Sequence, residues 1–197
     1  LSFELNIGRV TATIGTDPAR AEKTLWANLL DTAITRARES HIKLLHVPIT
    51  ETQRDFTSTA KALGLKQSRV YYSMEYRPAP VYLRGDYRPL PEGYRLRPMN
   101  ENEIGTLTDL QNMAFENSWG YAPNTVEETS AWLMLPGTGA EYTLFAVDNL
   151  DRAIAYTWTK FDQFNGSKIG YIAMVGVHPK YRRSGLGGAI VSASIRN

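Results

Sequence analysis

The residue pattern with the clearest chemical meaning lies near the end of the chain, in the loop Arg182-Arg183-Ser184-Gly185-Leu186-Gly187-Gly188. The loop follows an apolar segment ending in Val175-Gly176-Val177 and opens a helical pattern that begins at Leu186. A helix N-terminus presents unpaired N–H groups and the positive end of a dipole, and both favour phosphate oxygens. Glycines let the backbone approach an anion closely, and arginines add charge-assisted hydrogen bonds. The loop therefore predicts a diphosphate-binding site.

Two other phosphate-binding patterns are absent from this segment. It has no Lys-Ser/Thr pair of a P-loop and no Gly-x-Gly-x-x-Gly of a dinucleotide fold. A glycine-rich turn with solvated arginines is the alternative interpretation. The strand before the loop and the helix directly after it favour the binding site.

The elements expected around the loop form an α/β unit over residues 94–197. A strand is expected from Tyr94 to Met99, and Asn100 or Asn102 is expected to cap a helix to about Phe115. A second helix is expected from Thr125. Three strands should come next as an antiparallel meander, with turns at Asn149–Asp151 and Asn165-Gly166; they are Tyr142 to Asp148, Ala153 to Phe161 and Lys168 to Val177.

Residues 1–77 predict a smaller β-α-β-α-β unit. Apolar residues alternate from Leu1 to Ile14, as in one or two strands, and recur at helical spacing from Ala21 to Ser40. The rest of the unit is expected as a strand from Ile42 to Ile49, a helix from Thr52 to Leu63 stopped by Gly64, and a strand from Val70 to Tyr76. Residues 78–93 contain four prolines and predict a semi-rigid linker.

The two units share a strand–turn–helix pattern. Ile14-Gly15-Thr16-Asp17-Pro18 matches Val175-Gly176-Val177-His178-Pro179 at an offset of 161 residues (176 − 15), which also pairs Leu25 with Leu186. The first unit supplies the elements on the C-terminal side of this turn, and the second supplies those on its N-terminal side. We interpret the chain as the back half of one unit joined to the front half of another. A single permuted domain is the alternative.

Composition narrows the classes of function. The net charge is +2 without a basic stripe, which argues against nucleic-acid binding. The chain has no cysteine, its three histidines have no metal-ligand spacing, and no apolar run is long enough to cross a membrane. We expect a metal-free, cytoplasmic protein, whose exposed sheet edges would allow self-association.

The segment from Val175 to Gly188 resembles the acetyl-CoA signature of the GNAT superfamily of N-acyltransferases, Gln/Arg-x-x-Gly-x-Gly/Ala, met here by Arg182, Gly185 and Gly187. Residues 114–123 are similar to tandem members related to mycothiol synthase. The resemblance implies an α+β fold with a mixed, mostly antiparallel sheet flanked by helices. It also implies that acetyl-CoA donates an acetyl group to a small-molecule amine.

For individual residues, the resemblance implies that Val175, Gly176 and Val177 pair with the pantetheine arm as an added strand. A bulge near Ala173 to Val175 would free an N–H for the thioester carbonyl. Residues 182–188 would hold the diphosphate. In the first unit Ala21, Thr24 and Trp26 replace the motif residues, and a tryptophan at the helix start should obstruct a phosphate.

Glu116, Trp119 and Tyr121 are the candidates for the acceptor site, against the alternative that the two aromatic residues pack in the core. Asp162 is either a base or a solvated loop acid, and His178 is interpreted as a turn residue. No catalytic acid is assigned, since the family's tyrosine would lie beyond Asn197. A non-catalytic coenzyme A sensor and a nucleotide-phosphate binder are the rival functions.

Overall fold

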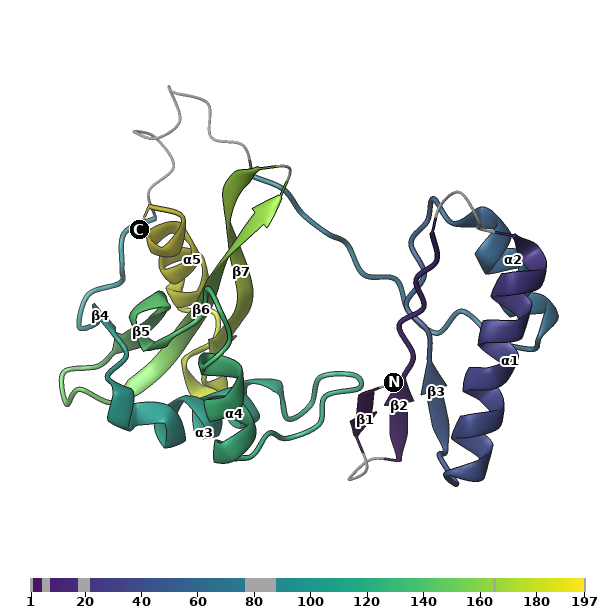
Figure 1. The fold of residues 1–197 in the computed structure, drawn as a ribbon. Coiled ribbons are helices and arrows are strands. Elements are labelled where there is room, and N and C mark those ends of the chain that lie inside the picture. Colours follow the sequence, from purple (N-terminus) through teal and green to yellow (C-terminus); the bar gives the residue numbers. More distant parts are fainter. Residues whose placement is uncertain (1, 5–7, 18–21, 77–87, 165, 197) are drawn as a thin grey trace. The chain divides into compact units, whose positions relative to one another are not determined.

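The structure is a computed structural model that describes residues 2–4, 8–17, 22–76, 88–164 and 166–196. The chain divides into two compact units, Leu1–Glu75 and Tyr76–Asn197 (Figure 1). Residues 78–87 of the expected linker lie outside the described residues, and residues 88–93 belong to the second unit.

The first unit is a three-stranded sheet with two helices. Its elements are β1 (Ser2–Glu4), β2 (Arg9–Thr11), α1 (Lys23–Glu39), β3 (Leu44–His46) and α2 (Arg54–Ala62). The strand order is β1-β2-β3; β2 pairs antiparallel with β1 and parallel with β3, and α1 makes the crossover. The helical spacing of residues 21–40 is confirmed, because the buried residues of α1 are Trp26, Leu30, Ala33 and Ala37.

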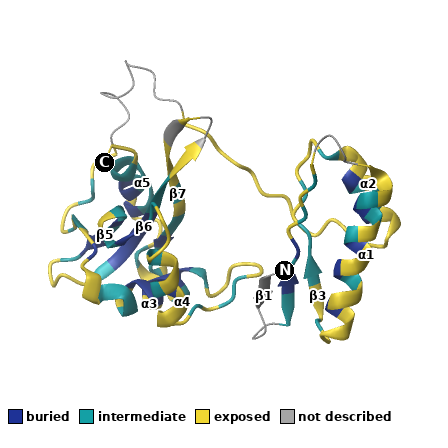
Figure 2. Cartoon of the chain, viewed as in Figure 1, coloured by how far each residue is buried: buried dark blue, intermediate teal, exposed yellow. Residues whose placement is uncertain are grey.

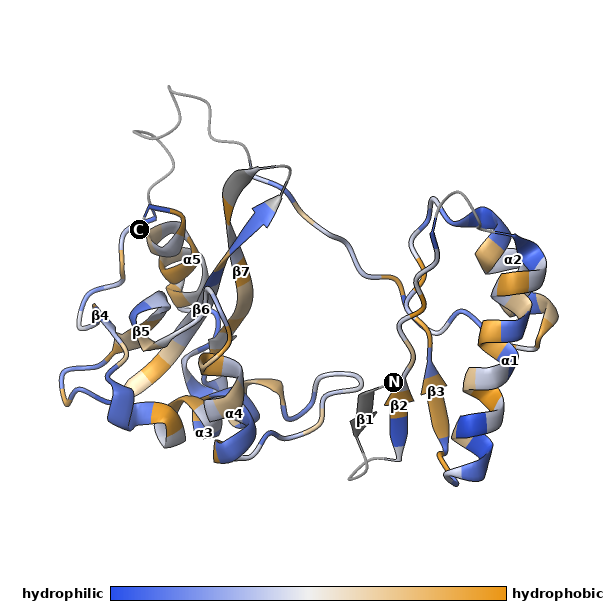
Figure 3. Ribbon diagram, viewed as in Figure 1, coloured by the Kyte–Doolittle hydropathy of each residue, from blue (hydrophilic) through white to orange (hydrophobic). Residues whose placement is uncertain are grey.

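The core of the first unit forms where the two helices meet. Trp26 stacks on Phe56 with ring centroids 4.4 Å apart, and Leu30 and Ala60 complete the buried cluster. Orange and blue segments alternate along α1 in Figure 3, as expected for a helix with one apolar face. Gly64 has a φ of +87° and ends α2 as predicted, because a left-handed residue closes the last turn.

The strand expected from Val70 to Tyr76 is not present. Residues 65–76 form neither helix nor strand, and Tyr72 and Met74 are 85% and 91% exposed. The alternation of apolar side chains is suited to a strand, but a strand also needs a neighbour that accepts and donates its backbone hydrogen bonds. No described segment pairs with these residues.

The second unit contains an antiparallel sheet in the order β4-β5-β6-β7. Its strands are β4 (Arg95–Pro98), β5 (Thr143–Val147), β6 (Ala153–Phe164) and β7 (Ser167–Val177). The expected meander and the turn at residues 149–151 are confirmed, since the backbone N–H of Asp148 donates to the Arg152 carbonyl across the turn. Asn165 lies outside the described residues, and Gly166 has a φ of +77°.

Helices cover both faces of this sheet (Figures 1 and 2). On one face, α3 (Ile104–Phe115) and α4 (Val126–Leu133) lie over a core that includes Leu107, Leu110 and Tyr156. On the other face, α5 (Leu186–Arg196) packs Leu186 and Ile190 against Ala155 and its neighbours. Three 3₁₀ turns join these elements, at Glu101–Glu103, Ala140–Tyr142 and Pro179–Tyr181.

Polar contacts define the starts of α3 and α4. Thr125 accepts the backbone N–H of Glu128 and donates its own N–H to the Glu128 carboxylate, a capping box that confirms the expected start of α4. Before α3, Glu103 accepts the N–H of Asn100 and forms a two-bonded ion pair with Arg97. The hydrogen bond from Arg97 lowers the pKa of Glu103, so this carboxylate stabilises the fold above its unfolded pKa and stops doing so as pH falls through the folded value.

The two segments that the sequence match pairs enter their helices differently. α1 begins at Lys23, so Trp26 is its fourth residue, and its side chain is buried in the core of the first unit. Trp26 therefore does not obstruct the helix start, contrary to the prediction. α5 begins at Leu186, between Gly185 and Gly187, whereas residues 22–26 contain no glycine, so the first unit lacks the motif.

Candidate functional site

The expected loop lies between the end of β7 and the start of α5. Beyond Val177, the His178 N–H donates to Ile154, and the 3₁₀ turn Pro179–Tyr181 leads into residues 182–185. Arg183 and Gly185 have φ values of +65° and +88°, which reverse the chain so that α5 begins directly at Leu186. The Ala189 N–H donates to Gly185, closing the first turn, and the Ser184 hydroxyl donates to the Tyr181 carbonyl. The predicted strand–loop–helix arrangement is present.

A side chain would have a different structural consequence at each of the three glycine positions of the loop. Gly185 needs its left-handed backbone conformation, which a side chain would strain. At Gly187 a Cβ would lie 3.6 Å from a Val177 methyl group, an ordinary contact. At Gly188 a Cβ would lie 2.9 Å from Cδ of Arg88 and would displace that side chain. The first turn of α5 therefore has no side chain at positions 187 and 188.

Arg182 makes hydrogen bonds to two backbone carbonyl groups. Its Nη2 donates to the Ala114 carbonyl at 2.6 Å, and its Nε lies 3.3 Å from the Val177 carbonyl. Ala114 is in the last turn of α3, where orphan carbonyls attract a cation. The guanidinium thus fastens the loop to α3 and to the end of β7. Arg182 and Arg183 are both exposed, so both keep positive charge at the rim of the loop.

Arg88 also reaches this loop, and sequence reasoning missed it. Its backbone N–H lies 3.4 Å from the Ser192 hydroxyl of α5, and its side chain lies against Gly188. Leu90 packs into the core beneath α5, and Pro91 is the neighbour of Gly185. Residues 88–91 therefore run along α5 and bring a guanidinium to its first turn. An arginine in a proline-rich segment gives no sequence signal of this contact.

β7 is the last strand of the described sheet, so the backbone groups that point away from β6 are open to an added strand. The ladder with β6 shifts within β7: Met174 pairs with Trp158 and Ile172 with Thr159, leaving Ala173 as the extra residue. The bulge expected near residues 173–175 is therefore present. A bulge bends its strand and leaves a residue out of the ladder.

The three candidate acceptor residues lie in or beside the segment between α3 and α4. Glu116 directly follows α3 and is exposed, and Trp119 is 44% exposed, so it is not a core residue. Tyr121 is half-buried; its ring lies 5.5 Å from that of Phe115, and its hydroxyl donates to Asn112 at 2.7 Å. Burial raises the pKa of Tyr121, so this phenol stays protonated at neutral pH.

Of the two remaining candidates, Asp162 lies away from the loop and His178 lies in the turn before it. Asp162 pairs with Ile169 toward the turn end of the β6–β7 hairpin, whereas the loop comes after Val177, paired with Ala155. Seven residues of strand separate Asp162 from Ala155, roughly 23 Å at the usual rise, so Asp162 does not reach the loop. His178 Nδ1 accepts the Lys180 N–H, which makes it a turn residue.

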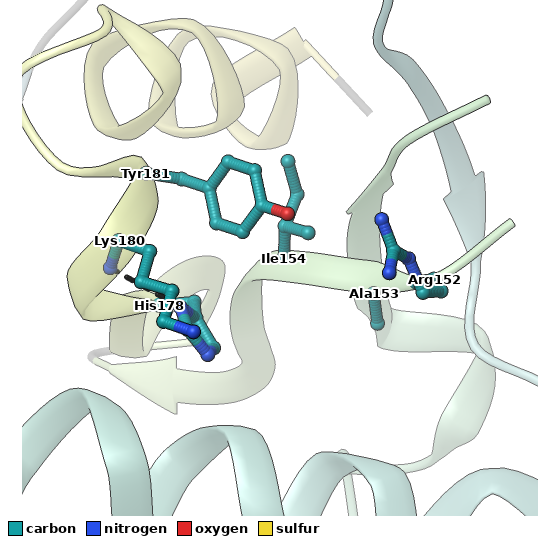
Figure 4. Close-up of a pocket in the computed structure, with 6 residues that line it drawn as sticks. All are labelled: Arg152, Ala153, Ile154, His178, Lys180 and Tyr181. Carbon is teal, nitrogen blue, oxygen red and sulfur yellow. Dashed lines mark hydrogen bonds between the residues drawn. The ribbon is translucent and has the colours of Figure 1, made fainter. Parts of the chain in front are cut away.

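A cavity of about 240 Å³ lies beside this turn (Figure 4). Arg152, His178, Lys180 and Tyr181 line it, together with Ala153 and Ile154. Arg152 is paired with Asp148 at 2.7 Å, which offsets part of the positive charge. The cavity adjoins the candidate loop but includes none of residues 182–188.

Over the described ranges, no group of three or more histidine, aspartate or glutamate residues is arranged to hold a metal ion. The described helices include none long and apolar enough to span a bilayer.

A bulged edge strand followed by a glycine-rich loop that opens a helix is the arrangement expected of GNAT acetyltransferases. The profile of the Acetyltransferase (GNAT) family matches residues 105–196, and the second unit of this chain belongs to that family. Mycothiol acetyltransferase of Propionibacterium freudenreichii subsp. shermanii is 26% identical over 136 residues, covering 69% of this chain and 43% of that protein. The chain thus spans less than half the length of this relative.

Two solved structures are similar to parts or most of this chain. A GCN5-related N-acetyltransferase from Sphaerobacter thermophilus superposes with a TM-score of 0.70 at 15% identity, covering 96% of this chain and 59% of that one. This likeness shows the shared fold. A GNAT family acetyltransferase from Brucella melitensis, solved in complex with acetyl-CoA, matches at 14% identity over 52% of this chain and 66% of that one, with a TM-score of 0.42.

Proposed function

We propose that the second unit binds acetyl-CoA at residues 182–188 and transfers the acetyl group to the amine of a small molecule. The observation that carries this proposal is the loop itself: it follows a bulged edge strand and leads into a first turn of α5 that has no side chains at positions 187 and 188. Membership of the GNAT family supports it.

The diphosphate of the coenzyme would sit against the N–H groups at the start of α5, where the helix dipole favours an anion. Arg183 and Arg88 would add positive charge at the rim. Arg182 would contribute indirectly, since its bonds to Ala114 and Val177 hold the loop in place. Ser184 and Leu186 would position the backbone, Ser184 through its bond to the Tyr181 carbonyl and Leu186 through its burial against the sheet.

The pantetheine arm would pair with the open edge of β7 along Val175, Gly176 and Val177. Gly176 is buried, and a Cβ there would overlap the Tyr156 ring and lie 3.0 Å from Cβ of Ala114. The close approach of β7 to α3 thus depends on this glycine. The bulge at Ala173 would free a backbone N–H for the thioester carbonyl, where charge develops during attack.

In the reaction, a neutral amine attacks the thioester carbon, the new C–N bond forms, and the C–S bond breaks. The thiolate of coenzyme A leaves and takes up a proton, and the amine loses one to a base. Glu116, Trp119 and Tyr121 would lie on the acceptor's side. We assign neither the acid nor the base.

Binding is tested by calorimetric titration with acetyl-CoA. Gly185→Val and Gly187→Trp should each lower the affinity at least about tenfold, because the first strains the left-handed turn and the second covers the helix start. Gly64→Asn, at the left-handed end of α2, is the matched control and should leave the affinity unchanged. Undiminished affinity in both loop variants would refute the site.

Transfer is tested by the release of coenzyme A, detected with a thiol reagent. The chain has no cysteine, so the thiol signal comes from the product alone. Binding without release across an amine panel would favour a coenzyme A sensor. Competition by ATP at the same loop would favour a nucleotide-phosphate binder.

A further inference from the structure

Three side chains from different elements meet beneath the bulge of β7. Nε2 of Gln111, on α3, lies 2.7 Å from Sδ of Met174, and the Tyr156 hydroxyl, on β6, lies 3.4 Å from the same sulfur. Two hydrogen-bond donors thus converge on a thioether, which is a weak acceptor. Met174 directly follows the bulged residue Ala173 and is only half-buried.

Two polar atoms in this region have no hydrogen-bond partner among the described residues. Gln111 is 2% exposed, and its Oε1 is unpaired; Trp158, 7% exposed and opposite Met174 in the ladder, has an unpaired Nε1. Exchanging the amide oxygen and nitrogen of Gln111 would only place the oxygen against sulfur and leave the nitrogen alone. Unpaired buried polar groups are costly, so a leucine at position 111 would serve the core better.

The cluster connects to the expected acceptor segment. Burial raises the pKa of Tyr156, and the nearby Tyr121 adds to the effect, so the two phenols are close enough to interact. Tyr121 in turn donates to Asn112, which also donates to Asn124 and so fastens the segment between α3 and α4. Gln111 thus directly precedes Asn112, which holds this segment, and its side chain reaches Met174 next to the bulge.

Building on the proposed function, we propose that Gln111 is an acceptor-binding residue whose amide oxygen takes a hydrogen bond from the neutral attacking amine. Met174 covers the amide and the Tyr156 hydroxyl while no acceptor is present. Methionine suits this role because its unbranched side chain has three rotatable bonds and moves at low cost. An amine N–H supplies the donor that Gln111 lacks, and its lone pair stays free for attack.

The cluster has no charged side chain and therefore favours an amine acceptor in its neutral, unprotonated form. Gln111, Tyr156, Trp158 and Met174 are all uncharged, so a protonated ammonium would lose its hydration without gaining a carboxylate partner. A neutral amine is both the form that fits and the form that attacks.

The kinetic test compares Gln111→Met with Thr108→Val in the full chain. Thr108 lies one turn earlier on α3, is also buried, and has a partner in Thr129 at 2.9 Å. Methylamine, ethanolamine and glucosamine serve as acceptors, and coenzyme A release is the signal. Gln111→Met should raise the KM for the amine at least about tenfold, with the KM for acetyl-CoA unchanged and the melting temperature unchanged or higher. Thr108→Val should lower the melting temperature and leave both KM values unchanged.

A purely structural role for Gln111 predicts the opposite pattern: an unchanged amine KM with at most a shift in melting temperature. That result would overturn the inference while leaving the proposed function intact. Failure of the wild-type chain to bind acetyl-CoA would instead refute both, and calorimetry separates the two cases.

A second measurement does not depend on turnover. In protein with ¹³C-labelled methionine methyl groups, the Met174 signal, assigned with Met174→Leu, should shift when ethanolamine is added to the acetyl-CoA complex. The signals of Met74 and Met134, both exposed, are the internal controls and should stay in place. If acetyl-CoA binds but the Met174 signal does not shift on addition of the amine, Met174 does not cover the acceptor position.

Discussion

The strand–turn–helix segments of the two units differ in what the first turn of their helix does. In α1, Trp26 is buried and stacks on Phe56, and Leu25 and Ala27 flank it. In α5, Leu186 takes the buried position, and glycines 185, 187 and 188 flank it. Leu186 thus begins the packed face of α5, which continues through Ala189 and Ile190, and the positions on either side of Leu186 carry no side chain.

The comparison shows that one framework can serve two purposes. An aromatic pair at a helix start contributes much apolar burial to a small unit with a short sheet. A start made of glycines gives up that packing and exposes N–H groups to an anion. The second unit compensates elsewhere, because both faces of its larger sheet are covered by helices.

The largest expected effect concerns the packed helix start of the first unit. Trp26→Ala should lower the free energy of unfolding of the first unit by about 3–5 kcal/mol, because it empties the centre of the cluster with Phe56 and Leu30. Denaturant unfolding followed by circular dichroism measures it. Trp132→Ala is the control, since that side chain is 57% exposed. Loss of acetyl-CoA affinity in Trp26→Ala would show that binding depends on the first unit.

A smaller effect is expected from the two glycines that the sequence match pairs. Gly176→Ala should cost about 1–3 kcal/mol, because its Cβ would overlap the Tyr156 ring at the contact with α3. Gly15→Ala should change stability by less than about 0.5 kcal/mol, since no atom lies within 4 Å of the added Cβ. Thermal unfolding of the two variants gives the difference, and equal losses would mean that the two turns are alike.

The smallest expected effect concerns N-terminal capping, which differs between α4 in the second unit and α1 in the first. Thr125→Ala should cost about 1 kcal/mol, because the Thr125 hydroxyl accepts the Glu128 N–H at the start of α4. Glu22→Ala should have almost no effect, as the Glu22 side chain makes no capping bond at the start of α1. Denaturant titrations of both variants test this, and a cost at Glu22 similar to that at Thr125 would show that α1 is capped in solution.

Most elements could be predicted because their signals are local. The spacing of Trp26, Leu30, Ala33 and Ala37 places one face of α1 in a core whatever the partner is, and the turn residues at 149–151 define a hairpin by themselves. The failure at residues 70–76 has the complementary reason: alternation describes a side-chain pattern, while a strand requires a backbone partner that no local pattern supplies.

The role of Trp26 could not be read from the sequence match. The match pairs Leu25 with Leu186 and so sets Trp26 opposite Gly187, at the start of a helix. In the structure α1 begins three residues before Trp26, and the Trp26 side chain is buried in the core. The start of a helix and its buried side depend on the elements packed against it, and a step of one residue turns the helix by about 100°.

By itself, the sequence determined the existence and order of the strand, the glycine loop and the helix after it, because backbone freedom at glycine and helical periodicity are properties of neighbouring residues. Only the tertiary structure decided which side chains meet there. Arg182 bonds to a carbonyl 68 residues away, Gln111 to a sulfur 63 residues away, and Arg88 lies on Gly188. Such contacts depend on how the sheet and helices pack, and chain order does not encode that packing locally.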